Sequence, residues 1–186
     1  KKKKNTINAS IGQGFVLTTP LQLATATAIT ASHGKKVVPS IAGEKQSVER
    51  TGITLNDESN WEKMTDAMVA VTGPRGTARV MAVDAQYAIA AKSGTAQVFS
   101  VGQDETYNED ELAERMLDHA LMVSFGPAEQ PAIAVGVLVE NGRHGGSTAG
   151  PVARQVMDAW LLNENGELEV PPVFEEHPAP PAEVSP

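Results

Sequence analysis

The sequence of 186 residues contains no cysteine and few aromatic residues, and both absences exclude classes of protein. Without cysteine there can be no disulfide scaffold, no thiolate zinc site and no cysteine nucleophile. Aromatic residues make up 4% of the chain, so a core has to be built from Ala, Val, Leu, Ile and Met. Apolar residues still reach 41%, which is too many for a wholly disordered chain.

Positive charge and long apolar runs are also scarce. Asp and Glu outnumber Lys and Arg by 23 to 15, and four of those bases form the run Lys1–Lys4, which looks like an artificial end or a placeholder for an excised segment. A net charge of −8 repels phosphate backbones, so we expect no nucleic-acid partner. Apolar stretches fall far short of the ~20 residues of a membrane helix, so we expect any anchor or export signal to lie outside this sequence.

The first half of the chain reads as two helices joined by a short strand. Thr18 or Thr19 as N-cap and Pro20 at the first position predict a helix over 21–32, with a face of small side chains at Ala24, Ala28 and Ala31. Residues 35–41 read as an edge strand. A capping box at Ser59–Glu62 predicts a second helix that ends at Gly73-Pro74 and whose buried stripe consists of Trp61, Met64, Met68 and Val71.

The second half reads mainly as strands. They are predicted over 87–98, 119–125 and 132–139, the last two as an antiparallel hairpin. Residues 104–118 hold seven acids and one Arg and are interpreted as a solvated helical excursion. The Gly-rich segment 140–150 is interpreted as a flexible loop, followed by a helix over 152–162 with Val152, Val156, Ala159 and Trp160 toward the core. The pattern is α+β with an antiparallel sheet.

One compact motif carries chemistry, namely Lys92-Ser93-Gly94-Thr95 on the predicted strand 87–98. Two hydroxyls and an ammonium group beside exposed backbone N–H groups suit a carboxylate, or a carbonyl that develops negative charge. Gly94 leaves room for a ligand to approach the backbone. No other motif is as specific: His33, His119 and His144 are scattered without a metal spacing, and no nucleotide-binding glycine motif occurs.

The surroundings of this motif resemble the class B penicillin-binding proteins. Residues 91–98 are similar to that family's K-[ST]-G box, and residues 10–14 with 19–24 are similar to the loop and helix that precede it. Residues 118–127 and 137–142 are similar to the two strands that follow it. The elongation-specific group of Gram-negative rods is the most similar, and the resemblance covers 5–165.

The family also needs an S-x-x-K box and an S-x-N box, and neither occurs here in a usable place. S-x-N is absent from the sequence, and the only S-x-x-K string, Ser32 to Lys35, closes a predicted helix instead of opening one. We therefore interpret residues 5–165 as the C-terminal part of a transpeptidase domain, 1–4 as the Lys run and 166–186 as a disordered Pro-rich tail. The nucleophilic Ser, its Lys and the S-x-N box are expected upstream.

The resemblance implies an αβα sandwich around an antiparallel sheet, without cofactor or metal. It implies acyl transfer by a serine D,D-transpeptidase that cross-links peptidoglycan stem peptides during cell-wall elongation and is a target of β-lactams. Lys92 and Thr95 take catalytic roles, while Ser93, Gly94 and Thr95 bind substrate, with Gln97 and Gln13 as further lining. The implied partners are the lipid-linked precursor and membrane-anchored elongation proteins, at the periplasmic face of the inner membrane.

Two other functions stay open from the sequence. One is a non-catalytic β-lactam sensor or peptide-binding module of the same fold, which would use the same strand to add a ligand strand. The other is a β-lactamase. A complete S-x-x-K and S-x-N upstream, with a membrane anchor, would distinguish a transpeptidase from both.

The missing nucleophile gives a first prediction. This chain by itself should not be acylated by a labelled penicillin, because no serine in it opens a helix with a lysine one turn later. Intact-mass measurement after incubation tests this. A covalent adduct on Ser32 or Ser93 would contradict it.

Overall fold

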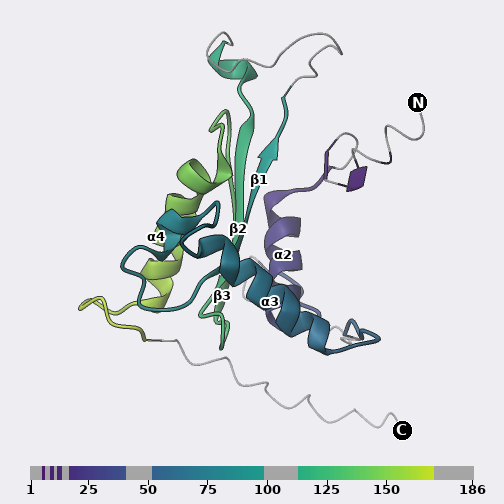
Figure 1. Cartoon of the computed structure of the whole chain (residues 1–186), viewed down its shortest axis with the longest axis vertical. Helices are drawn as coiled ribbons and strands as arrows, with labels where there is room; N and C mark the ends of the chain where they lie inside the picture. The colour runs from purple at the N-terminus through teal and green to yellow at the C-terminus, as the bar shows by residue number, and fades with distance from the viewer. Residues whose placement is uncertain are drawn as a thin grey trace, which may run out of the picture.

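A three-stranded antiparallel sheet forms the centre of the molecule (Figure 1). The structure is a computed structural model, and it describes residues 6, 9, 10, 12, 13, 17–40, 52–98 and 113–169. The strands are β1 (Ala90–Ala96), β2 (His119–Gly126) and β3 (Ile133–Val139), with β2 in the middle. Gly94 lies opposite Leu121, and Leu121 opposite Leu138, so the register is continuous across the sheet.

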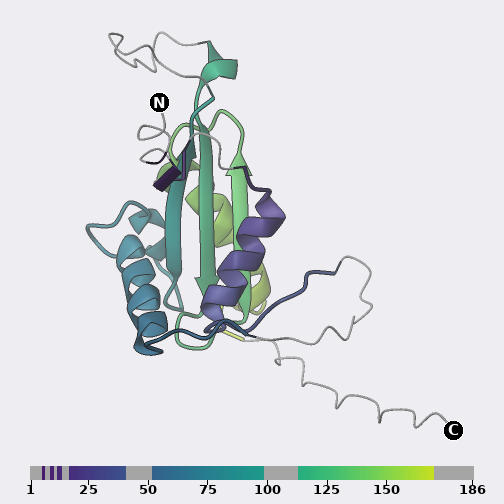
Figure 2. The ribbon, with the colours of Figure 1, turned by 90° about the vertical axis from the view of Figure 1, so that its right-hand side faces the viewer.

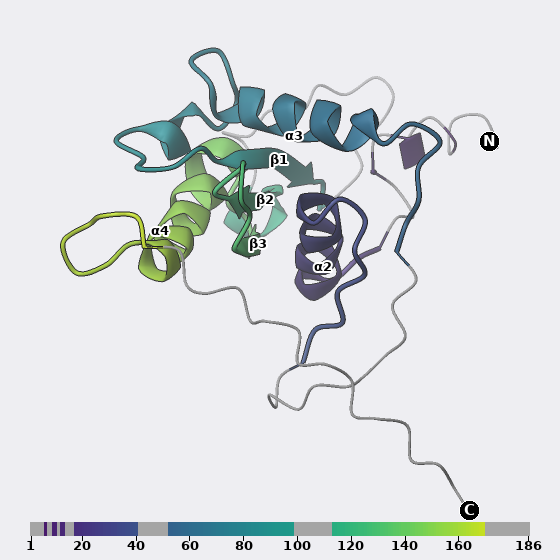
Figure 3. The same ribbon diagram turned by 90° about the horizontal axis from the view of Figure 1, so that it is seen from below.

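Helices cover both faces of this sheet (Figures 2 and 3). On one face lie α2 (Pro20–Ala31) and α3 (Ser59–Thr72), and on the other lies α4 (Gly150–Leu161). Each face has its own apolar cluster: Phe125 and Ala90 pack toward α2 and α3, whereas Met122 and Met157 belong to the larger cluster beneath α4. The expected αβα arrangement with an antiparallel sheet is confirmed.

The start of α2 follows its sequence closely. Thr19 is the N-cap and Pro20 occupies the first turn. The Thr19 hydroxyl accepts the Gln22 N–H at 3.2 Å, and the Gln22 side chain accepts the Thr19 N–H at 2.8 Å, which completes a capping box. Gly136 of β3 lets this helix cross the strand closely, because a Cβ on Gly136 would lie 3.1 Å from the Ala24 nitrogen.

The prediction for α3 is right about its length but wrong about its cap and part of its buried stripe. The N-cap is Glu58, which makes no side-chain cap hydrogen bond. Instead the Asp57 carboxylate accepts both the backbone N–H and the hydroxyl of Ser59, at 3.0 and 2.6 Å, so Ser59 already lies within the helix. Met64 is 52% exposed, since the helix turns Thr72 and the half-buried Met68 toward the sheet.

Two strand predictions are also corrected. Residues 35–40 are not a strand: they leave the end of α2 as irregular chain and do not join the sheet. The strand predicted over 87–98 is shorter at both ends, spanning Ala90–Ala96. Most of the acidic segment 104–118 lies outside the described residues. Its last part forms the short helix η3 (Glu114–Met116) before β2.

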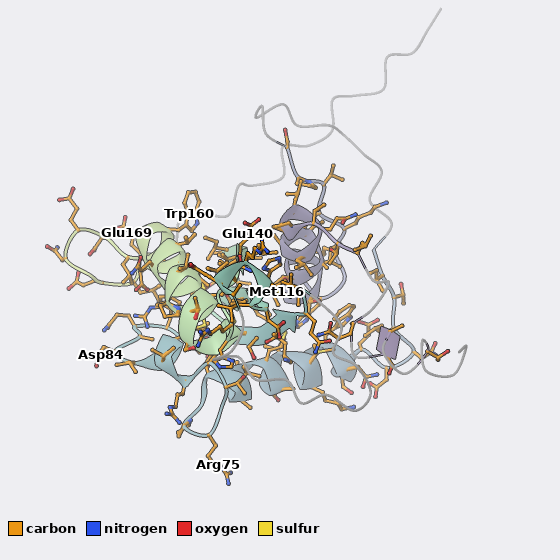
Figure 4. All side chains as sticks on the ribbon, turned by 90° about the horizontal axis from the view of Figure 1, so that it is seen from above. Arg75, Asp84, Met116, Glu140, Trp160 and Glu169 are labelled. Atoms are coloured by element: carbon orange, nitrogen blue, oxygen red, sulfur yellow. The ribbon has the colours of Figure 1, made fainter. Side chains whose placement is uncertain are left out.

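The side of α4 that faces the core was predicted wrongly. Ala153, Met157 and Leu161 are fully buried, whereas Val156 is 46% and Trp160 50% exposed, and Trp160 points away from the molecule (Figure 4). The apolar residues of this helix occupy both faces, so its periodicity alone could not choose between them.

A pair of substitutions on α4 tests this assignment. Met157→Ala should lower the free energy of unfolding by about 2–5 kcal/mol, because it opens a cavity under the sheet. The neighbouring Val156→Ala removes only exposed surface and should change it by less than about 0.5 kcal/mol. Denaturant titration of both variants measures the difference. Equal losses would show that the helix is rotated relative to this structure.

Candidate active site

The K-S-G-T motif lies in the second half of β1, at the edge of the sheet. Strand alternation puts Ser93 and Thr95 on the face that α4 covers and Lys92 on the opposite face. A hollow of about 370 Å³ opens beside this strand. Three segments that are distant in sequence line it, namely Thr77, Ser93–Thr95 and His144–Ser147.

A pair of hydroxyls forms the most direct link across this hollow. The Thr77 and Ser93 hydroxyl oxygens lie 2.9 Å apart, and either one can donate the proton to the other. Thr77 stands in the turn between α3 and the short helix η1 (Arg79–Ala82). The hollow therefore depends on how that turn is held against β1.

The second wall is a turn whose backbone packs directly against β1. A Cβ on Gly145 would lie 2.7 Å from the Gly94 carbonyl oxygen and 3.0 Å from the Gly94 nitrogen, and a Cβ on Gly146 would collide with the Thr77 carbonyl oxygen. Only glycine allows so close an approach of one backbone to another. The segment 140–150 is thus not a flexible loop. Its second half forms the π-helical turn η4 (Gly145–Ala149), which runs directly into α4.

A charged network holds η1, and with it the turn of Thr77, against α4. The Arg154 guanidinium donates to both carboxylate oxygens of Asp158 at 2.7 Å and to the carbonyls of Met81 and Val83 at 2.5 and 3.1 Å. The Tyr87 hydroxyl donates to the same Asp158 carboxylate at 2.7 Å. Burial, and then the hydrogen bond to this carboxylate, raise the pKa of Tyr87 far above its usual range. Tyr87 therefore remains a neutral donor.

Two more of the predicted site residues bind the strand's own backbone. The Gln13 amide donates to the Thr95 carbonyl at 2.8 Å, across 82 residues of sequence. The exposed Lys92 ammonium donates to the Ser93 carbonyl at 2.5 Å. Gln97 is exposed just beyond the end of β1 and is absent from the described lining of the hollow. Of the predicted site residues, Ser93, Gly94 and Thr95 line the hollow, Gln13 and Lys92 bind the backbone of β1 without lining it, and Gln97 does neither in the described contacts.

Sequence reasoning missed the part of the lining that lies outside β1, namely Thr77 and the segment His144–Ser147. Thr77 was treated as part of a turn, and Gly145 and Gly146 as part of a flexible loop. The signal that could have indicated the second segment is the Gly-Gly pair followed by Ser147 and Thr148, because such a pair marks a turn and glycine allows a close approach of backbone. Nothing near Thr77 in the sequence identifies Ser93 as its partner.

The arrangement suits recognition of a polar or anionic group beside an extended backbone. The lining of the hollow includes the hydroxyls of Thr77, Ser93 and Thr95, and Lys92 lies on the same strand. Among the described residues no cluster of His, Asp and Glu could hold a metal ion. In the same part of the chain no helix combines the length and apolarity needed to cross a membrane.

A larger hollow of about 640 Å³ lies elsewhere, between α2, α3 and the β2–β3 loop. Acidic and basic side chains are mixed along it, including Lys35, Glu62, Asp66 and Glu129. It contains none of the K-S-G-T residues. Its chemistry does not select one kind of ligand, so the smaller hollow beside β1 is the better candidate.

Comparison with known proteins identifies a family and several relatives. The family model for the penicillin-binding protein transpeptidase domain matches residues 1–158. Peptidoglycan D,D-transpeptidase MrdA of Acinetobacter baumannii is 49% identical over 169 residues, which cover 86% of this chain and 25% of that protein. MrdA of Escherichia coli K12 is 38% identical over 171 residues, covering 87% and 27%. The chain spans about a quarter of the length of these relatives.

Solved structures of penicillin-binding proteins are also similar to this chain. Pseudomonas aeruginosa PBP2 in complex with WCK 5153 superposes with a TM-score of 0.74 at 43% identity, covering 88% of this chain and 34% of that one. PBP2 of Helicobacter pylori, in a complex with MreC, has a TM-score of 0.66 at 26% identity, covering 81% and 26%.

The backbone contacts of the η4 turn lead to a prediction. Gly146→Ala should destabilise the protein by about 1–3 kcal/mol, because the added methyl group meets the Thr77 carbonyl, which cannot move freely. Ser147→Ala, at the next position of the same turn, adds no atom and should have little effect. Thermal unfolding compares the two variants. If Gly146→Ala is as stable as Ser147→Ala, the turn does not pack on Thr77 as described.

Proposed function

Because this chain belongs to the penicillin-binding protein transpeptidase family, we propose that the longer protein containing it is a serine D,D-transpeptidase that cross-links peptidoglycan stem peptides during cell-wall elongation. The observation that carries the proposal is the hollow beside β1, where the hydroxyls of Thr77, Ser93 and Thr95 lie along the edge of a strand. This arrangement supports binding of an extended peptide with an anionic end, because hydroxyl groups can donate hydrogen bonds to a carboxylate.

The proposed reaction has two acyl-transfer steps. The hydroxyl oxygen of a serine attacks the carbonyl carbon of the penultimate D-Ala of one stem, the bond to the terminal D-Ala breaks, and that D-Ala leaves with a proton on its nitrogen. The amine of a second stem then attacks the ester carbon, and the serine oxygen leaves and regains its proton. In this proposal the nucleophilic serine and its lysine belong to the rest of the longer protein.

Residues of β1 would serve this reaction in different ways. Lys92 would supply positive potential and assist proton transfer, since its exposed ammonium lies at the edge strand and binds the Ser93 carbonyl. The Ser93 and Thr95 hydroxyls would bind the carboxylate of the substrate or of a β-lactam. The Thr95 backbone N–H would be one of two donors to the developing oxyanion, a type of contact whose removal costs about 2.7–4 kcal/mol in other enzymes.

The setting of the enzyme is part of the same proposal. The relatives are peptidoglycan transpeptidases, which act on the cell wall, so we place the longer protein at the periplasmic face of the inner membrane. The H. pylori relative was solved in a complex with MreC, which supports a membrane-anchored elongation partner. The ligand classes are the lipid-linked precursor and β-lactams.

Two substitutions on β1 test the roles. In the full-length protein Lys92→Ala should slow acylation by a fluorescent penicillin by about 10²-fold, because a charge in a preorganised cleft acts more strongly than in water. Thr95→Ala should slow it about tenfold, since it removes one neutral hydrogen bond but keeps the backbone donor. The second-order acylation rate constant measures both.

A matched control separates catalysis from charge and stability. Lys36 is exposed beyond α2, so Lys36→Ala makes the same charge change away from the site and should acylate like the wild type. Thermal unfolding of each variant excludes loss of the fold. Acylation of Lys92→Ala at the wild-type rate would remove Lys92 from the mechanism, and wild-type protein that never labels would contradict the proposed enzyme.

A further inference from the structure

The outer edge of β1 presents backbone acceptors to a ligand. Gly94 is paired with Leu121 of β2. The Gly94 nitrogen and oxygen and the Leu121 oxygen all lie close to Gly145, as expected if the backbone groups of Gly94 point toward β2. Neighbouring residues of a strand direct their backbone groups to opposite sides, so the carbonyls of Ser93 and Thr95 point away from β2. Such an edge can bind an extended peptide as an added strand.

Side chains of the protein itself already occupy both of these carbonyls. The Lys92 ammonium binds the Ser93 oxygen at 2.5 Å, but this side chain is exposed and belongs to the residue just before Ser93, so it can exchange with water easily. Gln13 is different. It is half-buried, comes from the segment before α2, and its amide binds the Thr95 oxygen at 2.8 Å.

We propose that Gln13 is a specificity-determining residue which competes with the ligand for the Thr95 carbonyl. The inference rests on the proposed function, since it concerns the peptide that this edge binds. A ligand that adds to β1 must displace the Gln13 amide and replace its hydrogen bond with an N–H of its own. A ligand without a donor at that position loses the bond and gains none, so Gln13 selects for peptide N–H groups.

The competition predicts that removing the Gln13 amide strengthens binding. Gln13→Met keeps the length of the side chain but has no donor, so the Thr95 carbonyl is free for the ligand. One net hydrogen bond in water contributes little, so the dissociation constant of a matching peptide should fall about two- to tenfold. A residue that only supports β1 would instead weaken binding when replaced.

The experiment uses the full-length protein and a fluorescein-labelled acyl-D-alanyl-D-alanine peptide, with analogues N-methylated at one amide at a time. Fluorescence anisotropy gives the dissociation constants of the wild type, of Gln13→Met, and of Gln155→Met as the control. Gln155 is exposed on α4, so its replacement should leave every dissociation constant unchanged. We expect Gln13→Met to tighten binding of the parent peptide but not of one N-methylated analogue.

Two outcomes overturn the inference: weaker or unchanged binding of the parent peptide by Gln13→Met, or equal tightening of every analogue. Penicillin labelling of the wild type is read separately. Because anisotropy does not require acylation, an unlabelled protein with the expected Gln13 pattern would contradict the enzyme but support the competition. A protein that is labelled by penicillin but lacks the expected Gln13 pattern would support the enzyme and contradict the competition.

Discussion

The close contact between the η4 turn and the backbones of β1 and Thr77 is the constraint on which the candidate site depends. Gly145 lies against Gly94, and Gly146 lies against the Thr77 carbonyl, in each case without an intervening side chain. This proximity fixes the distance between the turn after α3 and the edge strand, and so brings the Thr77 and Ser93 hydroxyls together. It also fixes the start of α4, because η4 continues into that helix without a break.

The Arg154 network secures the same arrangement from the opposite end of η1. A partly buried ion pair is favourable only when its remaining hydrogen-bonding groups are also satisfied. Here the Arg154 guanidinium binds carbonyls of η1 and the Tyr87 hydroxyl binds Asp158, so both charged groups have several partners. The helix α4 therefore contributes to the hydrophobic core through one face and to the support of the site through its charged side.

Local signals predicted well wherever a single segment decided the outcome. The helix start, predicted with Thr18 or Thr19 as N-cap and found at Thr19, and the hairpin of β2 and β3 are confirmed because neighbouring residues determine them. The α3 cap was wrong because Asp57, outside the predicted box, takes the donors of Ser59. The K-S-G-T motif was found from sequence, but the pairing of Thr77 with Ser93 and the position of Gln13 arise only when distant segments fold together.

The paired hydroxyls of Thr77 and Ser93 give the hollow a chemical versatility that a carboxylate or an ammonium group would not have. Each hydroxyl can donate or accept, and rotation of the two O–H bonds reverses the direction of the hydrogen bond without moving any heavier atom. A guest that carries a negative oxygen would find a proton turned toward it, and a guest that carries an N–H would find a lone pair. The same rigid scaffold can thus bind successive reaction species of different polarity, because only the two O–H bonds have to rotate.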